Sequence, residues 1–161
     1  MKKILCSVLL LVTLSSVAFA GKREGRIQAG GGVGLGARPP VRFDLNFNGE
    51  YFLTQTLSLG LNLDMLLRGP NNFVFMPFAR YNFDLSFAPE WVPYVGGGIG
   101  VGIDTNGSGT LDIMIPEFGF KYELIEDKFF VGPDLSLHTL TNFDNTTWDF
   151  RFLIATVDFR F

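Results

Sequence analysis

The sequence predicts an all-β fold: an eight-stranded antiparallel up-and-down β-barrel that spans a membrane and follows a cleaved signal peptide. Three observations predict it. Apolar and polar residues alternate at period two along most of the chain, turn residues interrupt this alternation at regular intervals, and 18 of the 161 residues are phenylalanine. Strict alternation is the pattern of a β-strand whose two faces meet different surroundings. The length suits one domain of ordinary size.

Four segments in the first half of the chain alternate in this way. Segment 26–36 reads RIQAGGGVGLG, and segment 41–48 reads VRFDLNFN. Segment 57–65 reads LSLGLNLDM, with leucine at every second position, and segment 73–84 reads FVFMPFARYNFD, with aromatic residues on one face. Each segment is therefore expected to form one strand.

Four more segments follow in the second half of the chain. Segment 92–103 reads VPYVGGGIGVGI, and segment 114–124 reads MIPEFGFKYEL. Segment 129–138 reads FFVGPDLSLH, and segment 150–161 reads FRFLIATVDFRF. In each of them large apolar residues alternate with glycine or polar residues, so each is also expected to form a strand.

Turn-forming residues separate these segments. Connections are expected near 37–40, 49–55, 67–72, 85–91, 104–110, 125–128 and 140–148. They contain Pro39-Pro40, Gly49-Glu50, Gly69-Pro70, Asn106-Gly107 and Asp144-Asn145, which favour turns. The intervening strands of about ten residues have the length of a tilted membrane-spanning strand.

Prolines inside the expected strands indicate irregular pairing. Proline removes a hydrogen bond from the ladder and is normally kept at strand starts, edges or bulges. Pro93 fits a strand start, whereas Pro77, Pro116 and Pro133 are expected to mark bulges.

The two faces of the strands decide which side of the barrel is apolar. One face carries most of the phenylalanines, and the other carries glycine, Arg, Asp, Asn, Glu and Lys. The lumen of an eight-stranded barrel is only wide enough to be filled by side chains. Because the large apolar set does not fit there, we expect it to face lipid and the glycine and charged set to face the lumen. A closed barrel also leaves no free sheet edge in hydrocarbon.

Composition excludes several classes of function. A net charge of −3 gives no basic surface for nucleic acid. A single Cys excludes a disulfide framework, and a single His excludes a multi-histidine metal site. We therefore expect no cofactor and no metal.

Residues 1–20 have the pattern of a secretory signal peptide. Lys2 and Lys3 precede a short apolar run, and Ala18-Phe19-Ala20 is an A-x-A cleavage site. The run is too short for a transmembrane helix. We expect cleavage after Ala20, which leaves residues 21–161 as a barrel domain beyond the inner membrane.

Two motifs carry a resemblance to a known family. The segment 91–100 reads WVPYVGGGIG and resembles the P-Y-x-G-x-G-x-G strand of small OmpA/OmpX-like outer-membrane barrels. The last strand resembles the C-terminal recognition strand of bacterial outer-membrane proteins, because Phe159 and Phe161 end it in register with its apolar face. The resemblance implies a cell outer-membrane location in contact with outer-membrane lipid. It also implies that Phe159 and Phe161 form an assembly signal read by the barrel-assembly machinery. We expect a monomer.

The polar face holds weak candidates for catalysis. Ser136 and His138 lie on the same face of one expected strand. The order Ser-x-His is the reverse of the His-x-Ser of outer-membrane lipid A deacylases. Asp134 lies about 13 Å from position 138 at the rise of a strand, too far to orient that ring, so another acid would be needed. Polar filling of the lumen is the preferred interpretation of this pair.

A lumen ion-pair network is expected from the charged positions. Its members are Arg80, Asp84, Glu117, Lys121, Asp158 and Arg160. Buried charges must pair, so this network would seal the lumen. The alternation also places an apolar set inward, towards the outer half of the lumen: Met76, Phe78, Ile113, Ile115, Phe152 and Ile154. Such a set resembles the acyl-chain slot of the outer-membrane lipid A palmitoyltransferase.

Two glycine ladders should also face the lumen from opposite walls. They are Gly30, Gly32 and Gly34, and the run from Gly96 to Gly102. They either make room for neighbouring side chains or line a ligand slot.

The sequence thus predicts a small outer-membrane barrel with a sealed polar and glycine-rich lumen. Its expected role is structural or membrane-maintaining, and it is expected to be neither an enzyme nor a wide pore. All four outward connections are short, which disfavours a large protein partner. The alternatives are a lipid A-modifying acyltransferase or deacylase, and a carrier of small apolar ligands in the outer half of the lumen.

Overall fold

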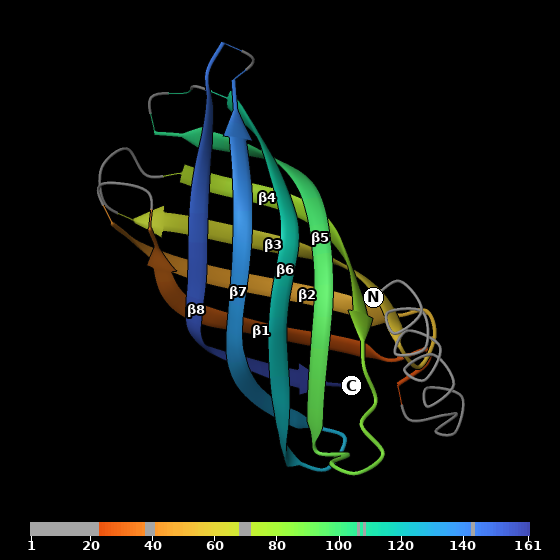
Figure 1. Cartoon of the computed structure of the whole chain (residues 1–161). Helices are drawn as coiled ribbons and strands as arrows, with labels where there is room; N and C mark the ends of the chain where they lie inside the picture. Colours follow the sequence, from red (N-terminus) through yellow and green to blue (C-terminus); the bar gives the residue numbers. More distant parts are fainter. Residues whose placement is uncertain (1–22, 38–40, 68–71, 106, 108, 143) are drawn as a thin grey trace, which may run out of the picture.

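The computed structural model describes residues 23–37, 41–67, 72–105, 107, 109–142 and 144–161. These residues form a closed antiparallel barrel of eight strands, in which β8 pairs with β1 (Figure 1). The predicted all-β, eight-stranded up-and-down barrel is confirmed. The predicted signal peptide and its cleavage after Ala20 lie outside the described residues.

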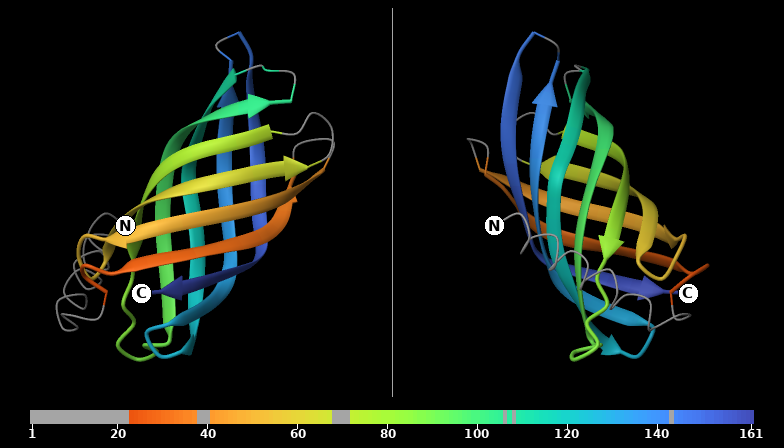
Figure 2. Two further views of the ribbon diagram at one scale, coloured as in Figure 1. Left: turned by 180° about the vertical axis from the view of Figure 1, so that it is seen from behind. Right: turned by 45° about the vertical axis from the view of Figure 1, so that its right-hand side comes forward.

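The strands differ in length around the barrel. They are β1 (Ile27–Gly36), β2 (Arg42–Phe52), β3 (Leu57–Leu67), β4 (Asn72–Asn82), β5 (Trp91–Asp104), β6 (Gly109–Ile125), β7 (Phe129–Thr141) and β8 (Thr146–Arg160). The first four contain 10 or 11 residues, and the last four contain 13 to 17. The four long strands lie side by side, so one wall of the barrel is built from longer strands than the other (Figure 2). Among the described residues, no helix is long and apolar enough to cross a membrane.

The two ends of the barrel carry different connections. At one end, called the terminal end here, β1 begins, β8 ends, and the chain turns between β2 and β3, β4 and β5, and β6 and β7. The opposite end, called the loop end, carries the other four connections. Of the connections between these strands, the longest is 83–90, which joins β4 to β5 at the terminal end.

The β2–β3 turn lies later in the chain than predicted. Gly49-Glu50 was expected to form a turn, but β2 continues through both residues to Phe52. The turn is made instead around Thr54, whose Oγ1 accepts a hydrogen bond from the backbone N–H of Leu57 at 3.0 Å. This continuation places Glu50 on the lumen face, where it is buried.

Alternation separates the two faces of the wall as predicted along β2, β3 and β4. Phe43, Phe47 and Leu61 point outward and are about half exposed, whereas Asp44, Asn46 and Asn62 between them are buried. The exposed apolar surface is far larger than a soluble protein carries, so it is a surface for hydrocarbon.

A bulge in β6 reverses the faces predicted for part of that strand. Between Met114 and Glu117 the pairing with both β5 and β7 shifts by one residue, so the extra residue lies in β6 at Ile115-Pro116. The bulge expected at Pro116 is therefore present. Met114, expected outward, is buried in the lumen, and Ile115, expected inward, is 63% exposed. Ile113 also lies on the outward side of the wall, since Asp112 and Met114 on either side of it are buried inward.

A second bulge reverses part of β8. The register shifts against β7 between Gly132 and Asp134 and against β1 between Val33 and Gly34, which places the extra residue of β8 at Ile154-Ala155. Leu153, expected outward, is buried, and Phe152 and Ile154, expected inward, are 45% and 56% exposed.

The remaining two prolines behave differently from each other. Pro133 lies opposite the β8 bulge, at the position where the register shifts. Pro77 points outward, and the register of β4 with β3 and β5 is the same on both sides of it. The prediction of a bulge at Pro77 is therefore wrong. This outward proline interrupts the hydrogen bonds of the ladder without adding a residue to the strand.

The apolar slot predicted for the lumen is not formed. Of its six proposed members, Met76 and Phe78 point inward, and Ile113, Ile115, Phe152 and Ile154 point outward because of the two bulges. The inward apolar cluster consists instead of Val74, Met76, Phe78 and Met114.

The two glycine ladders lie on β1 and β5, four strands apart on opposite walls. Their lumen faces are filled by neighbouring side chains. A Cβ built on Gly98 would lie 2.9 Å from Cγ of Met76, and one on Gly100 would lie 2.7 Å from Cβ of Met76. On β1, a Cβ on Gly32 would lie 3.0 Å from Cγ2 of Thr156. These glycines make room for side chains of the adjacent strands.

The outward orientation of β3 predicts the effect of a charge on its lipid face. Leu61 lies near the middle of the strand and is 47% exposed. Leu61→Arg should lower the free energy of unfolding in lipid vesicles by about 2–4 kcal/mol, because the guanidinium must enter hydrocarbon. Urea titration followed by tryptophan fluorescence measures this, with Leu61→Ile as the control. Equal stability of both variants would place this face in water.

The close packing of β5 against β4 predicts that Gly100→Ala is destabilising. The added methyl meets the backbone carbonyl of Phe75 as well as Met76, so the wall itself must shift. A loss of about 1–3 kcal/mol in the free energy of unfolding is expected. Gly49→Ala is the matched control, since nothing lies within 4 Å of a Cβ at that strand position. Equal effects of the two substitutions would contradict the packing described here.

Candidate functional site in the barrel lumen

A network of charges fills the terminal half of the lumen around Glu50. The carboxylate of Glu50 accepts hydrogen bonds from Nζ of Lys121 and, at 2.8 Å, from Oγ of Ser58. Lys121 also lies 3.7 Å from Oδ2 of Asp158, and Nη1 of Arg80 lies 3.8 Å from Glu50. These side chains are buried, so each charge is neutralised by its neighbours rather than by bulk water.

Arg80 joins this network to the middle of the lumen. Its Nε and Nη2 donate to the two carboxylate oxygens of Glu117 at 2.9 and 2.5 Å, a bidentate pair. The guanidinium also lies over the rings of Phe78 and Tyr94, at 4.2 and 4.8 Å from their centroids. The Tyr94 hydroxyl in turn donates to Oδ2 of Asp134 at 2.7 Å. Salt bridge and ring contacts together hold the arginine across the lumen.

A second network fills the loop half of the lumen around Arg151. Its guanidinium donates to Asp112 at 2.9 Å, to Asp64 at 3.0 Å and to Asp149 at 3.3 Å. Asp64 also accepts a hydrogen bond from Nδ2 of Asn46 at 2.6 Å. One arginine thus ties together strands β3, β6 and β8 from inside the barrel.

Ser136, His138 and Asp112 form a hydrogen-bonded chain within this second network. Ser136 Oγ lies 3.0 Å from His138 Nε2, and His138 Nδ1 lies 2.9 Å from Asp112 Oδ1. This is the connectivity of a serine–histidine–aspartate triad. The acid that sequence reasoning lacked therefore comes from the neighbouring strand β6, where Met114 is paired with His138.

The triad-like chain has no room for a substrate in this structure. Ser136, His138 and Asp112 are all buried, and the lumen cavity beside them measures about 10 Å³. A cavity needs roughly 10–15 Å³ of such volume to hold one water molecule, so this cavity has no room for an acyl chain or an ester group. Asp112 is in addition shared with Arg151. The arrangement satisfies buried polar groups and leaves the serine hydroxyl inaccessible.

A third group of charges lies at the terminal end of the lumen. Arg23 pairs with Asp84 at 2.7 Å, and Arg160 pairs with Asp127 at 3.3 Å and with Oε1 of Gln28 at 3.2 Å. Burial lowers the pKa of the Arg23 guanidinium, an effect that the neighbouring carboxylates, chiefly Asp84, oppose.

The structure divides the six predicted network residues between two places. Arg80, Glu117, Lys121 and Asp158 lie together in the terminal-half network. Asp84 and Arg160 lie at the terminal end and have other partners.

Sequence reasoning missed several central members of the networks. Glu50 had been assigned to a turn. Asp112 and Arg151 are absent from the predicted network, because alternation without the two bulges places them on the outward face. Among the described residues, no group of three His, Cys, Asp or Glu side chains is placed to hold a metal ion.

The predicted assembly signal lies at the end of β8. The ring of Phe159 packs on that of Phe129 with centroids 5.0 Å apart, and the backbone N–H of Phe161 donates to the carbonyl of Ile27 at 2.8 Å. Both phenylalanines are exposed. The last residue therefore closes the ladder between β8 and β1.

Comparisons with known proteins identify the fold. No protein-family model and no curated protein matches the chain. The N-terminal β-barrel domain of Pseudomonas aeruginosa OprF is 18% identical over 86% of this chain and 98% of that domain, with a TM-score of 0.60. Neisserial surface protein A is 14% identical over 84% of this chain and 96% of its own, with a TM-score of 0.63. OprG from Pseudomonas aeruginosa is 11% identical over 88% of this chain and 98% of its own, also with a TM-score of 0.63.

A de novo designed transmembrane β-barrel matches as well, with 12% identity over 89% of this chain and a TM-score of 0.56. Because evolved and designed proteins share this architecture, the likeness concerns structure and carries no activity. The closed eight-stranded barrel, its apolar outer face and these matches agree: the chain has the fold of the small eight-stranded outer-membrane β-barrels.

Proposed function

We propose that this protein is a non-conducting barrel of the outer membrane with a structural or membrane-maintaining role. The observation that carries the proposal is the filled lumen. Two buried ion-pair networks and the apolar cluster of Val74, Met76, Phe78 and Met114 occupy it, and the cavity between them measures about 10 Å³. Ions cannot cross such a lumen without breaking several buried salt bridges.

The outer surface supports the proposed location. The exposed apolar face would contact outer-membrane lipid directly. We propose that the chain is exported through residues 1–20, with cleavage after Ala20, and inserted by the barrel-assembly machinery, which would read Phe159 and Phe161. The short connections at the loop end support a monomer without a large protein partner.

The sealed lumen predicts the absence of channel activity. The purified barrel in planar lipid bilayers should show no stepwise conductance. The triple variant Phe78→Ala, Arg80→Ala, Glu117→Ala removes the side chains that cross the middle of the lumen and should conduct when it folds. Heat-modifiable migration in gels checks the folding of both proteins. Regular conductance steps from the wild type would contradict a sealed lumen.

A lipid A deacylase is the second candidate, favoured by the chain of hydrogen bonds from Ser136 through His138 to Asp112. Deacylation would require the hydroxyl of Ser136 to reach an ester carbonyl, with His138 as the base and Asp112 as its orienting acid. The burial of all three residues opposes this role. We therefore propose that they satisfy hydrogen bonds within the lumen and do not act on lipid.

Mass spectra of lipid A separate the two candidates. Cells that express the wild type, Ser136→Ala, His138→Ala or no protein should give identical spectra. The purified variants should lose about 1 kcal/mol of unfolding free energy for each hydrogen bond removed. A lipid A species that appears only with the wild type and disappears in both variants would establish catalysis, since members of a triad act as a unit.

A further inference from the structure

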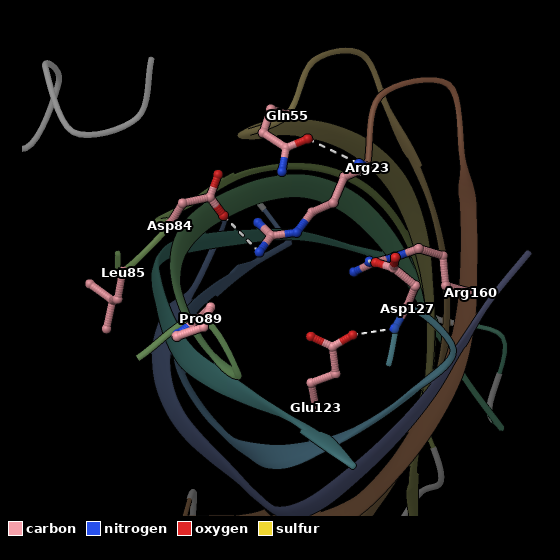
Figure 3. Close-up of a pocket in the computed structure, with 8 residues that line it drawn as sticks. All are labelled: Arg23, Gln55, Asp84, Leu85, Pro89, Glu123, Asp127 and Arg160. Atoms are coloured by element: carbon pink, nitrogen blue, oxygen red, sulfur yellow. Dashed lines mark hydrogen bonds and ion pairs between the residues drawn. The ribbon is translucent and has the colours of Figure 1, made fainter. Parts of the chain in front are cut away.

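A polar pocket of about 80 Å³ opens at the terminal end of the barrel, apart from the sealed part of the lumen. Its lining combines two arginines, three carboxylates, one amide and two apolar side chains (Figure 3): Arg23, Arg160, Asp84, Glu123, Asp127, Gln55, Leu85 and Pro89. They come from the segment before β1, from the ends of β6 and β8, and from the three connections at this end.

Arg23 lines this pocket and carries a donor without a partner among the described residues. Its side chain is only 8% exposed, and Nη1 has no hydrogen-bond partner among the described residues. The backbone around it is fixed, because its N–H donates to Oε1 of Gln55 at 3.0 Å and its carbonyl accepts from the N–H of Arg26 at 3.0 Å. Arg160 contributes a second such donor, since its Nε also lacks a partner in the described part of the chain.

Unsatisfied acceptor capacity lies in the same pocket. Asp84 binds Arg23 through Oδ1, but its Oδ2 is buried without a partner among the described residues, and its side chain is 9% exposed. Glu123 lies across the pocket from Arg23, with its carboxylate directed towards the interior (Figure 3). Asp127 is held beside it, because its backbone N–H donates to Glu123.

This combination selects the charge type of a ligand. A purely anionic ligand would satisfy the arginine donors but would meet three carboxylates at close range. A purely cationic ligand would satisfy Asp84 and Glu123 but would leave the guanidinium donors unpaired. Buried groups of both signs that lack partners favour a ligand with both signs.

We propose that this pocket binds a small α-amino acid, with its carboxylate at Arg23 and Arg160 and its ammonium at Asp84 and Glu123. A volume of about 80 Å³ holds several water molecules, since roughly 10–15 Å³ of such cavity volume holds one, so the pocket has room for an ammonium and a carboxylate on one carbon. Leu85 and Pro89 supply an apolar wall for a short side chain. The binding function is separate from the proposed sealing of the lumen and holds whether or not the barrel conducts.

Three related probes test the proposal on the full barrel in detergent micelles. Alanine carries both charged groups, propionate lacks the ammonium, and ethylamine lacks the carboxylate. Alanine should shift the amide resonances of Arg23 and Asp127. Propionate and ethylamine should bind at least about tenfold more weakly than alanine, as expected for the loss of a hydrogen bond between charged groups. An absence of shifts with alanine at millimolar concentration overturns the proposal. Equal binding of propionate or of ethylamine overturns it too.

Matched variants locate the binding. Arg23→Gln and Asp84→Asn should each weaken alanine binding about tenfold or more. Arg26→Gln and Glu24→Gln change the same charges on neighbouring exposed residues that do not line the pocket, and they should leave the affinity unchanged. If the control variants lose as much affinity for alanine as the pocket variants do, the effect is one of net charge and the pocket is not the binding site. If a variant fails to fold, the titration of the wild type with the three probes still tests the proposal.

Discussion

Charge pairing inside a narrow lumen is the constraint on which the rest of this structure depends. An eight-stranded barrel encloses little more than its own inward side chains. Each charged group there must meet an opposite charge within a few ångströms, because bulk water cannot solvate it. Arg80 reaches Glu117 and Arg151 reaches three aspartates, so pairs and clusters span the barrel from one wall to another. The glycine ladders follow from this crowding, since inward side chains of the adjacent strands occupy the space that a Cβ atom on these glycines would need.

Much of the wall could be predicted from alternation alone, and the failures have a physical cause. Along β2, β3 and β4 the period of two continues without interruption, so the inward position of Arg80 follows directly from the sequence. In β6 and β8 an extra residue reverses the phase, and a bulge depends on pairing with both neighbouring strands, which local sequence does not contain. Pro116 marks the first bulge within its own strand, whereas the second is marked only by Pro133 on the facing strand β7, because the apolar pair Ile154-Ala155 gives no such signal. Reading β8 without its bulge places Arg151, the centre of the loop-half network, in lipid.

Under the structural role proposed above, the serine–histidine–aspartate chain is a catalytic connectivity that arises from the need to satisfy buried polar groups. A histidine buried among carboxylates has two ring nitrogens to satisfy, and a serine on the same strand face with an acid on the next strand does so. Sequence analysis identified Ser136 and His138 but not Asp112, because the partner lies across a ladder whose register depends on the β6 bulge. The distances between these atoms match those of a hydrolase triad, whereas the serine hydroxyl is buried.

The unequal strand lengths have a consequence for the surrounding lipid. At about 3.3 Å per residue, β1 with 10 residues extends roughly 33 Å, and β6 with 17 residues extends roughly 56 Å. The apolar band of such barrels is about 25 Å tall. The short wall just spans a bilayer at an ordinary strand tilt, whereas the long wall projects beyond it. The protein therefore imposes a different hydrophobic mismatch on each side, and the annular lipids must adjust their thickness around its circumference or the whole barrel must lean.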